Sequence, residues 1–307
     1  MLPFKERNPV MTVKNKPKML GLNKTEPFDV VIFVLLTLFA LIIFYPFYNA
    51  VLTSFVTSKQ YIMNPAMLYP KAITFDNYKI ILQNPLIGSG YKNTLILTVA
   101  GVAYSLTLTA SMAYAFSRKA FPGKRIFFML VLFTMFFSGG LVPIYMLMKN
   151  LGLMNSLAGL ILMAGISPFY MILVKSSFEQ VPDSIEEAAK IDGANDITIF
   201  LRIMLPLQLP ILATITLFIA VDRWNEWFFA MLFLREGTKW PLQVLLRAIV
   251  MEAASDRDVA FSSVSQNVFS NGIKMAAVMV TMLPVMLVYP FLQKYFVKGV
   301  MVGAIKM

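Results

Sequence analysis

Long apolar runs constrain this chain more than any other feature of its sequence. Of its 307 residues, 58% are hydrophobic and only 14% are charged, whereas about a quarter of a typical soluble domain is charged. A run of about 20 apolar residues is long enough to cross a bilayer as a helix. The sequence therefore predicts an all-α integral membrane protein with six transmembrane helices. The predicted spans are 28–51, 93–116, 126–148, 156–178, 207–234 and 273–291.

The distribution of Lys and Arg predicts the orientation of these spans. Basic residues are dense in segments 1–27, 118–125 and 294–307 and sparser in the longer segment 235–271. Short basic segments are retained on the cytoplasmic side, so both ends of the chain are expected inside. We therefore expect a cytoplasmic N-terminal tail (1–27), a six-span domain (28–293) and a cytoplasmic C-terminal tail (294–307).

The net charge of +11 raises the question of a nucleic-acid partner. The basic residues are dispersed at the ends of the predicted spans and form no basic stripe, which is the footprint of nucleic-acid binding. A lipid bilayer is therefore the expected partner, and nucleic acid is not.

Glycine and proline interrupt two of the predicted spans. Gly139, Gly140 and Pro143 lie within the third span, and Pro284 lies within the sixth. Such residues either mark a broken helix that lines a transport path or end a helix. Both alternatives stay open for the third span, and a kink or break is expected at Pro284.

The residues needed for most catalytic chemistry are missing. The chain has no Cys and no His, which removes the commonest nucleophiles, general bases and metal ligands. No phosphate-binding GxxxxGK[ST] pattern occurs either. We therefore expect no catalytic residues, no metal and no bound cofactor, so the chain is not expected to be an enzyme.

The segment 183–206 is the longest charged stretch between two apolar runs in the C-terminal half. Asp183 and Glu186 have the spacing of a capping box, which predicts a helix start. Ala188 and Ala189 fall on one face of that helix. Gly193 stands where a left-handed residue would end it.

A second short helix is expected to follow this glycine. Asn195 or Asp196 can cap it, and Pro206 either ends it or opens the next helix. Two short helices between two spans form a compact protrusion. Small residues on one face would let the backbone of another protein approach closely.

The same segment resembles the EAA signature of the permeases of ABC importers. Every position of that signature is filled here, by Glu187, Ala188, Ala189, Gly193, Ile203, Leu205 and Pro206. The resemblance implies a type I importer permease in which this segment is the cytoplasmic coupling helix. It also implies that the segment docks into a cleft of an ATPase subunit, with Glu187 near a basic residue there.

Other segments are similar to the carbohydrate branch of these permeases, represented by the second membrane subunit of the maltose transporter. They are AYAFSR (113–118), FPG (121–123), LGLMNS (151–156), WNEW (224–227) and FVKG (296–299). The set most resembles the subgroup that serves complex oligosaccharides or polysaccharide fragments in Gram-positive bacteria.

This resemblance implies a set of partners in a bacterial plasma membrane. They are a second homologous permease that forms a heterodimer, two cytoplasmic ATPase subunits that bind ATP and Mg²⁺, and an extracellular solute-binding protein. The segment 235–271 is expected to contact the binding protein. The implied function is the permease subunit of an ATP-driven oligosaccharide importer.

A polar cluster lies in the predicted fifth span. Trp224, Asn225, Glu226 and Trp227 follow Asp222 and Arg223 in an otherwise apolar run. Charged groups inside a span are costly and usually face a cavity or the interior of a bundle. One interpretation is that Trp224, Asn225, Glu226 and Trp227 line the path of a polar substrate. The other is an aromatic belt with polar contacts near the outer interface.

Three other functions compete with oligosaccharide import. A permease for another solute, such as an amino acid, a peptide or phosphate, would share the EAA signature. An integral-membrane enzyme would need acid–base or metal-binding residues at one membrane face, and the only such cluster, Asp222 with Glu226, lacks partners in the sequence. A membrane scaffold for a cytoplasmic protein could use a docking helix but would not need polar or broken spans.

Overall fold

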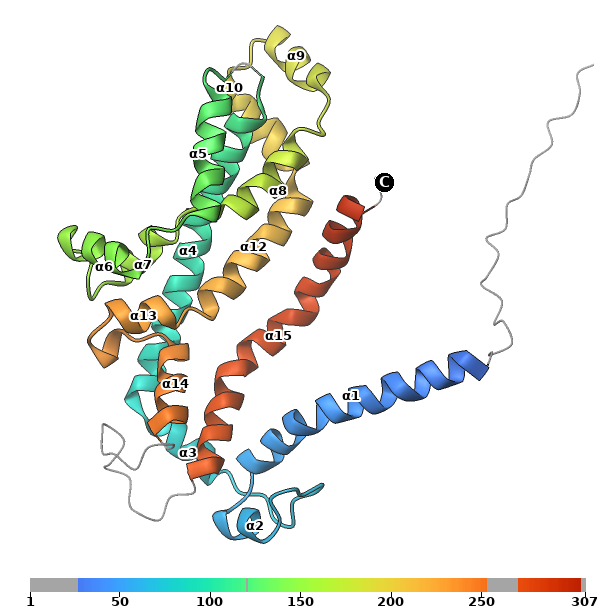
Figure 1. Cartoon of the computed structure of the whole chain (residues 1–307), viewed down its shortest axis with the longest axis vertical. Coiled ribbons are helices and arrows are strands. Elements are labelled where there is room, and N and C mark those ends of the chain that lie inside the picture. The colour runs from blue at the N-terminus through green and yellow to red at the C-terminus, as the bar shows by residue number, and fades with distance from the viewer. Residues whose placement is uncertain (1–26, 120, 253–269, 305–307) are drawn as a thin grey trace, which may run out of the picture. The chain divides into compact units, whose positions relative to one another are not determined.

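The computed structural model describes residues 27–119, 121–252 and 270–304, and every regular element in these ranges is a helix (Figure 1). The chain divides into two units, Met1–Asn49 and Ala50–Met307. The helix α1 (Pro27–Ser54) supplies the described part of the first unit and reaches the start of the second. It is apolar along its length, as expected of the first predicted span.

The second unit is built around α4 (Pro85–Ser117), a helix of 33 residues. Its main partners are α12 (Leu209–Trp224) and α8 (Pro168–Phe178). The helix begins eight residues before the predicted second span because the side chain of Asn84 caps it, accepting a hydrogen bond from the N–H of Leu86 at 2.9 Å. Asn at the N-cap followed by Pro is a typical helix start.

Three pairs of helices are sharply bent. The angle is 114° between α5 (Lys124–Phe136) and α6 (Leu141–Asn150), and 52° between α7 (Leu157–Met163) and α8. The segment Asp196–Leu207 meets α12 at 81°. Among the described residues, three helices are long and apolar enough to cross a membrane, or up to six if each bent pair is one span.

The interruption predicted in the third span is confirmed as a break between two helices. Gly140 has φ +87°, a conformation that residues with a Cβ rarely adopt. The chain therefore turns sharply between Phe136 and Leu141, so that α6 leaves at a steep angle to α5.

Two sequence predictions about the later spans are wrong. The fifth span was expected to reach residue 234, but α12 ends at Trp224 and a separate helix, α13 (Phe228–Phe233), follows. Glu226 favours this new start because its side chain accepts a hydrogen bond from the N–H of Phe229 at 3.1 Å. A kink or a break was expected at Pro284, and the break is wrong, because α15 (Ser270–Ala304) continues through it.

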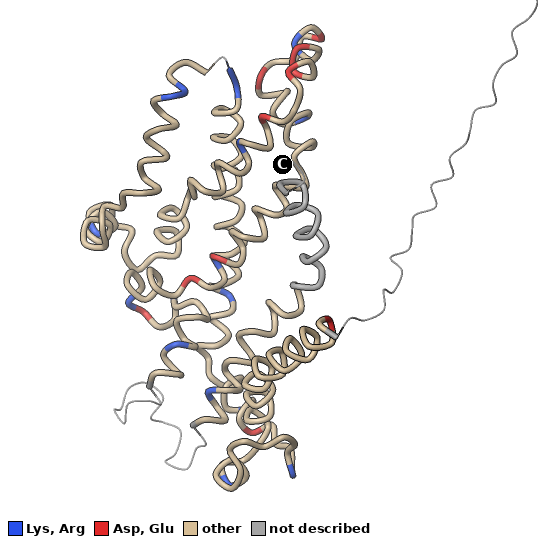
Figure 2. The backbone as a smooth tube through the Cα atoms, turned by 45° about the vertical axis from the view of Figure 1, so that its right-hand side comes forward, with Lys and Arg blue, Asp and Glu red and all other residues tan. Residues whose placement is uncertain are grey.

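The remaining helices are short and lie in the second unit. They are α2 (Ser58–Met63), α3 (Asp76–Gln83), α9 (Asp183–Ile191), α10 (Asp196–Thr198), η1 (Ile199–Met204), α11 (Leu205–Leu207), η2 (Gly237–Lys239) and α14 (Leu242–Glu252). Helices α9 and α10 lie at one end of this unit, and α3 lies at the other (Figure 1). Charged residues lie at both ends of this unit and also in its middle (Figure 2).

Polar side chains of α4 hold the segment that leads into α14. Asn93 donates hydrogen bonds from Nδ2 to the carbonyl oxygens of Thr238, at 2.8 Å, and Trp240, at 3.2 Å. Thr94 Oγ1 accepts from the N–H of Leu242 at 2.8 Å. Buried backbone groups need such partners, so these contacts fix the start of α14 against α4.

A substitution at Gly159 tests how closely α7 packs against its neighbours. A Cβ built at this position would lie 2.4 Å from the carbonyl oxygen of Leu153 and 2.9 Å from Cε of Met148. Because the first contact is with backbone, Gly159→Ala should destabilise the protein by about 1–3 kcal/mol. The measurement is the midpoint of thermal unfolding in detergent, followed by tryptophan fluorescence.

Gly88→Ala is the matched control for this prediction. A Cβ at Gly88, within α4, has nothing within 4 Å, and alanine favours a helix by about 0.5–1 kcal/mol over glycine. The control should therefore keep or raise the midpoint. Equal midpoints for the two variants would contradict the packing described for α7.

Candidate functional site

The first helix of segment 183–206 ends as the sequence predicts. Gly193 has φ +81°. Its N–H donates to the carbonyl of Lys190 at 3.0 Å, and the N–H of Ala194 donates to the carbonyl of Ala189 at 2.9 Å. These two bonds form a Schellman motif. The side chain of Ala189 is buried in the core, so this end of α9 is fastened to the rest of the unit.

The second helix begins at Asn195. Its Oδ1 accepts a hydrogen bond from the N–H of Thr198 at 2.8 Å, so Asn195 and not Asp196 is the cap. The helix then runs through α10, the π-helix η1 and α11. Pro206 lies inside α11, and the helix ends at Leu207 before the 81° turn into α12.

The capping box predicted at the start of α9 is wrong. Pro182 occupies the N-cap position, and no side chain caps the helix there. Asp183 Oδ2 instead accepts a hydrogen bond from Lys119 Nζ at 2.5 Å, and Glu186 pairs with Arg118. Both carboxylates therefore bind the basic loop after α4, and neither caps the helix.

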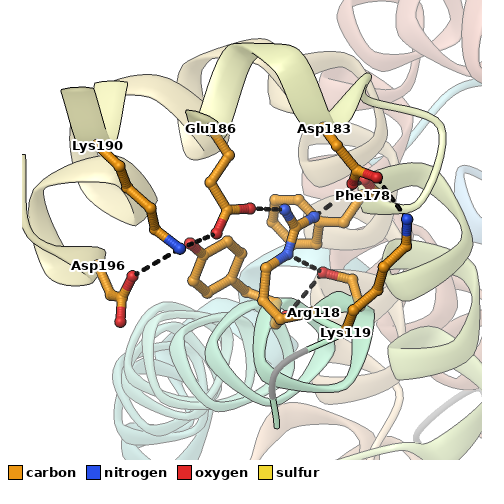
Figure 3. A network of polar contacts seen from close by, with 9 residues as sticks. Arg118, Lys119, Phe178, Asp183, Glu186, Lys190 and Asp196 are labelled. Carbon is orange, nitrogen blue, oxygen red and sulfur yellow. Dashed lines mark hydrogen bonds and ion pairs between the residues drawn. The ribbon is translucent and has the colours of Figure 1, made fainter. Parts of the chain in front are cut away.

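Arg118 lies at the centre of a polar network shown in Figure 3. Its Nη1 pairs with Glu186 Oε2, and its Nη2 donates to the carbonyl oxygen of Phe178 at 3.3 Å. Its Nε donates to Ser117 Oγ at 3.0 Å, and its guanidinium carbon lies 5.0 Å from the ring centroid of Tyr114. Arg118 thus joins the ends of α4 and α8 to α9.

Lys190 completes this network from within the segment. Its Nζ lies 2.8 Å from Glu186 Oε1 and 3.6 Å from Asp196 Oδ1. Burial would raise the pKa of Glu186, but hydrogen bonds from Lys190 and Arg118 outweigh it and hold that pKa below its ordinary value. The hydrogen bond from Lys119 likewise lowers the pKa of Asp183.

The opposite face of α9 is exposed. Glu187 and Ala188 lie on the surface, and Ile191 is 86% exposed, as is Ile197 of the following α10, at 70%. Within the described ranges, Glu187 makes no ion pair. Small and apolar side chains beside one free carboxylate make a surface that suits another protein. Of the other signature residues, Ile203 and Leu205 are half-buried and pack against the core.

The polar cluster of the predicted fifth span surrounds a cavity of about 310 Å³ at the break between α12 and α13. Its lining residues are Val221, Asp222, Arg223, Asn225, Glu226, Trp227 and Phe228. Trp224 does not line it, because its side chain is buried among residues of α3, α14 and α15. The structure therefore brings Asn225, Glu226 and Trp227 to one cavity.

Two partners of this cavity come from distant segments and escaped the sequence analysis. Tyr170 donates a hydrogen bond from its hydroxyl to Asp222 at 2.7 Å. The guanidinium carbon of Arg247 lies 3.7 Å from the ring centroid of Trp227, so a cation covers one face of that ring. No local pattern marks these residues, because each lies on another helix.

Arg223 is held between the cavity and α4. Its Nη1 lies 4.0 Å from Glu226 Oε2, three positions further along the chain. A Cβ at Gly101 of α4 would lie 3.0 Å from Cδ of Arg223. The glycine therefore leaves room for the aliphatic part of this arginine.

The ion pair of Glu186 gives a pH-dependent prediction. Because the folded protein holds the pKa of Glu186 low, the carboxylate stabilises the fold at pH 7, and this contribution is lost as the pH falls through that lowered pKa. Glu186→Gln should destabilise the protein by about 1.5 kcal/mol at pH 7 and at pH 5. The difference from wild type, measured as the unfolding midpoint, should shrink below about pH 4.

The neighbouring glutamate provides the control for this experiment. Glu187→Gln removes an exposed carboxylate that has no ion pair among the described residues, so the unfolding midpoint should follow wild type at every pH. A Glu186→Gln variant that equals wild type at pH 7 would contradict the stabilising pair.

The chain is similar to several known proteins. It is 41% identical over 284 residues to the polygalacturonan/rhamnogalacturonan transport system permease protein YtcP of Bacillus subtilis, covering 92% of this chain and 99% of the relative. It is 30% identical over 278 residues to the diacetylchitobiose uptake system permease protein NgcG of Streptomyces coelicolor, covering 89% and 87%.

A solved structure and a family model agree with these relatives. The structure of a bacterial ABC transporter involved in the import of the acidic polysaccharide alginate matches with a TM-score of 0.81 and 36% identity, covering 88% of this chain and 96% of that one. The family model of the binding-protein-dependent transport system inner membrane component matches residues 105–302. The resemblance seen in the sequence is thereby confirmed, and the chain belongs to this family of ABC transporter permease subunits.

Proposed function

We propose that this chain is one of two permease subunits of an ATP-driven importer of oligosaccharides, with uronate-containing glycans as the first candidates. The exposed face of α9 is the observation that supports a partner protein driving transport through this chain. The substrate class is supported by the relatives, which are named for polygalacturonan, rhamnogalacturonan and diacetylchitobiose transport, and by the alginate transporter.

The proposed topology has six spans with both ends of the chain in the cytoplasm. The ion pairs between Arg118 and Glu186 and between Lys119 and Asp183 support it, because they bring the α4–α5 loop and α9 to the same end of the unit. The α4–α5 loop is also rich in Lys and Arg, as the positive-inside rule requires of cytoplasmic loops.

In this proposal the ATPase is a partner subunit that holds ATP and Mg²⁺. Its cleft receives α9, with Glu187 free to pair with a basic residue and Ala188 allowing close approach. ATP binding closes the ATPase pair, and α9 moves with it. The helices then shift from an inward-open to an outward-open arrangement. ATP binding thus changes the relative populations of these two arrangements.

The cavity at the α12–α13 break is the proposed contact with substrate. Asn225 and Glu226 offer hydrogen-bond partners for sugar hydroxyls, and Arg223 could pair with a carboxylate of a uronate. Trp227 can stack on a sugar ring only on the face that Arg247 leaves free. The extracellular binding protein would deliver the sugar and contact segment 235–271, of which 253–269 lie outside the described residues.

The bacterial plasma membrane is the proposed location, and a Gram-positive source is supported by the relatives from Bacillus subtilis and Streptomyces coelicolor. A permease for amino acids, peptides or phosphate is disfavoured, because the relatives described above are named for glycans. A membrane scaffold is disfavoured by the polar cavity, which a scaffold does not need.

The proposed function is tested on the complex co-expressed with its neighbouring genes and reconstituted in lipid. ATP hydrolysis should rise several-fold when the binding protein and an oligogalacturonide are added together, and should rise less with a neutral oligosaccharide. Stimulation by an amino acid or a peptide would contradict the substrate class. Failure of any ATPase to co-purify would contradict the role as an ABC permease.

A substitution in the cavity tests the proposed path. Asn225→Ala removes an exposed amide that accepts a hydrogen bond from Gln243 at 3.3 Å. Sugar uptake should fall about tenfold, because the sugar loses about one hydrogen bond. Asn150→Ala, at the exposed end of α6, is the control and should leave uptake unchanged. Equal uptake by both variants would remove Asn225 from the path.

A further inference from the structure

Adjacent glutamates of α9 have different surroundings. The side chain of Glu186 is 15% exposed and faces Arg118, which is also 15% exposed, whereas Glu187 lies on the surface. A docking partner can therefore reach Glu187 directly. Glu186 is already engaged within the chain, and its role has to be sought there.

The contact of Glu186 with Arg118 differs from the other ion pairs of α9. Lys119 and Asp183 are 83% and 58% exposed, and Lys190 and Asp196 are 49% and 78% exposed. Exposed pairs contribute little because water screens them. Among the described residues, the Arg118–Glu186 pair is the one ion pair between α4 and α9 in which both side chains are mostly buried.

The geometry of Arg118 makes this contact directional. A guanidinium is planar and offers five donors in a fixed fork. Here the guanidinium of Arg118 donates to groups on three elements at once. They are Ser117 at the end of α4, the carbonyl of Phe178 at the end of α8, and Glu186 of α9 (Figure 3). A movement of α9 therefore acts on the end of α4 through a short and oriented link.

The other part of this link is α4 itself. It is one continuous helix from Pro85 to Ser117, so it connects Arg118 to Gly101. At Gly101 the stem of Arg223 packs against the helix, and a Cβ there would lie only 3.0 Å from Cδ of Arg223. Arg223 lines the cavity at the α12–α13 break.

We propose that Arg118 is a positioning residue that carries the displacement of α9 through α4 to Arg223 and the cavity. This inference rests on the proposed function, because it requires that a partner moves α9. Glu187 then serves docking, and Glu186 serves transmission. Loss of the Arg118–Glu186 pair leaves the ATPase bound but disconnects it from the substrate path.

The test uses the whole complex with its ATPase and binding protein in proteoliposomes. The variants are Arg118→Gln, Glu186→Gln and the two combined. Three quantities are measured: co-purification of the ATPase, stimulation of ATP hydrolysis by glycan-loaded binding protein, and glycan uptake. We expect unchanged co-purification and at least a tenfold loss of both stimulation and uptake in each single variant.

The combined variant tests whether the two residues act together. If they act through one ion pair, the defect of the double variant should be clearly smaller than the product of the two single defects, because each single variant has already lost the pair. Multiplied defects would mean independent roles and would overturn the proposal. The combination of Lys119→Gln with Asp183→Asn is the matched control and should stay within twofold of wild type.

A distance measurement separates transmission from a general loss of structure. The chain has no Cys, so spin labels at Ser184→Cys in α9 and Ser111→Cys in α4, both exposed positions, are specific. In wild type the distance should stay constant when ATP binds, and with Arg118→Gln it should change. A change of the same size in wild type would overturn the proposal.

The outcomes also distinguish the two levels of inference. A wild-type complex that lacks a co-purifying ATPase would refute the proposed function. An active wild-type complex whose Arg118→Gln variant keeps normal stimulation and uptake would refute the transmission role alone.

Discussion

The backbone polar groups of a chain in an apolar medium have to find partners within the chain itself, and the structure follows from this constraint. Most of the described residues form helices, and at several breaks between helices a side chain supplies a partner for the backbone. Asn84 caps α4, Asn195 caps the helix after Gly193, and Glu226 binds the backbone at the start of α13. The break at Glu226 also creates the polar cavity, so the same need for partners shapes the candidate substrate path.

Ion pairs fix the structure at the end of the unit where α9 lies. The basic loop after α4 meets the acidic face of α9, and the pair between Arg118 and Glu186 is shielded enough from water to fix their geometry. Because this pair and the burial of Ala189 hold one face of α9 to the core, the opposite face is presented to the surroundings. The carboxylate of Glu187 lies on that exposed face, where a partner protein can reach it.

Much of this arrangement was predictable because it depends on local sequence. Gly193 and Asn195 act within a few residues of themselves, and apolar runs mark helices directly. The capping box failed because the helix starts at Asp183 itself, with Pro182 as the N-cap, and the Asp183 carboxylate binds Lys119, more than 60 positions away. The roles of Tyr170 and Arg247 at the cavity were invisible for the same reason, since only packing between helices brings them there.

The central claim is that the exposed face of α9 receives the ATPase, and cysteine cross-linking tests it most directly. Since the chain has no Cys, a single cysteine can be placed at Ala188, or at the exposed Thr134 of α5 as the control. The co-expressed ATPase carries single cysteines at successive positions along its cleft. A short thiol cross-linker applied to the membranes should join the Ala188→Cys permease to this ATPase and should not join the Thr134→Cys permease. Absence of any product from Ala188→Cys, with the ATPase bound, would contradict the account.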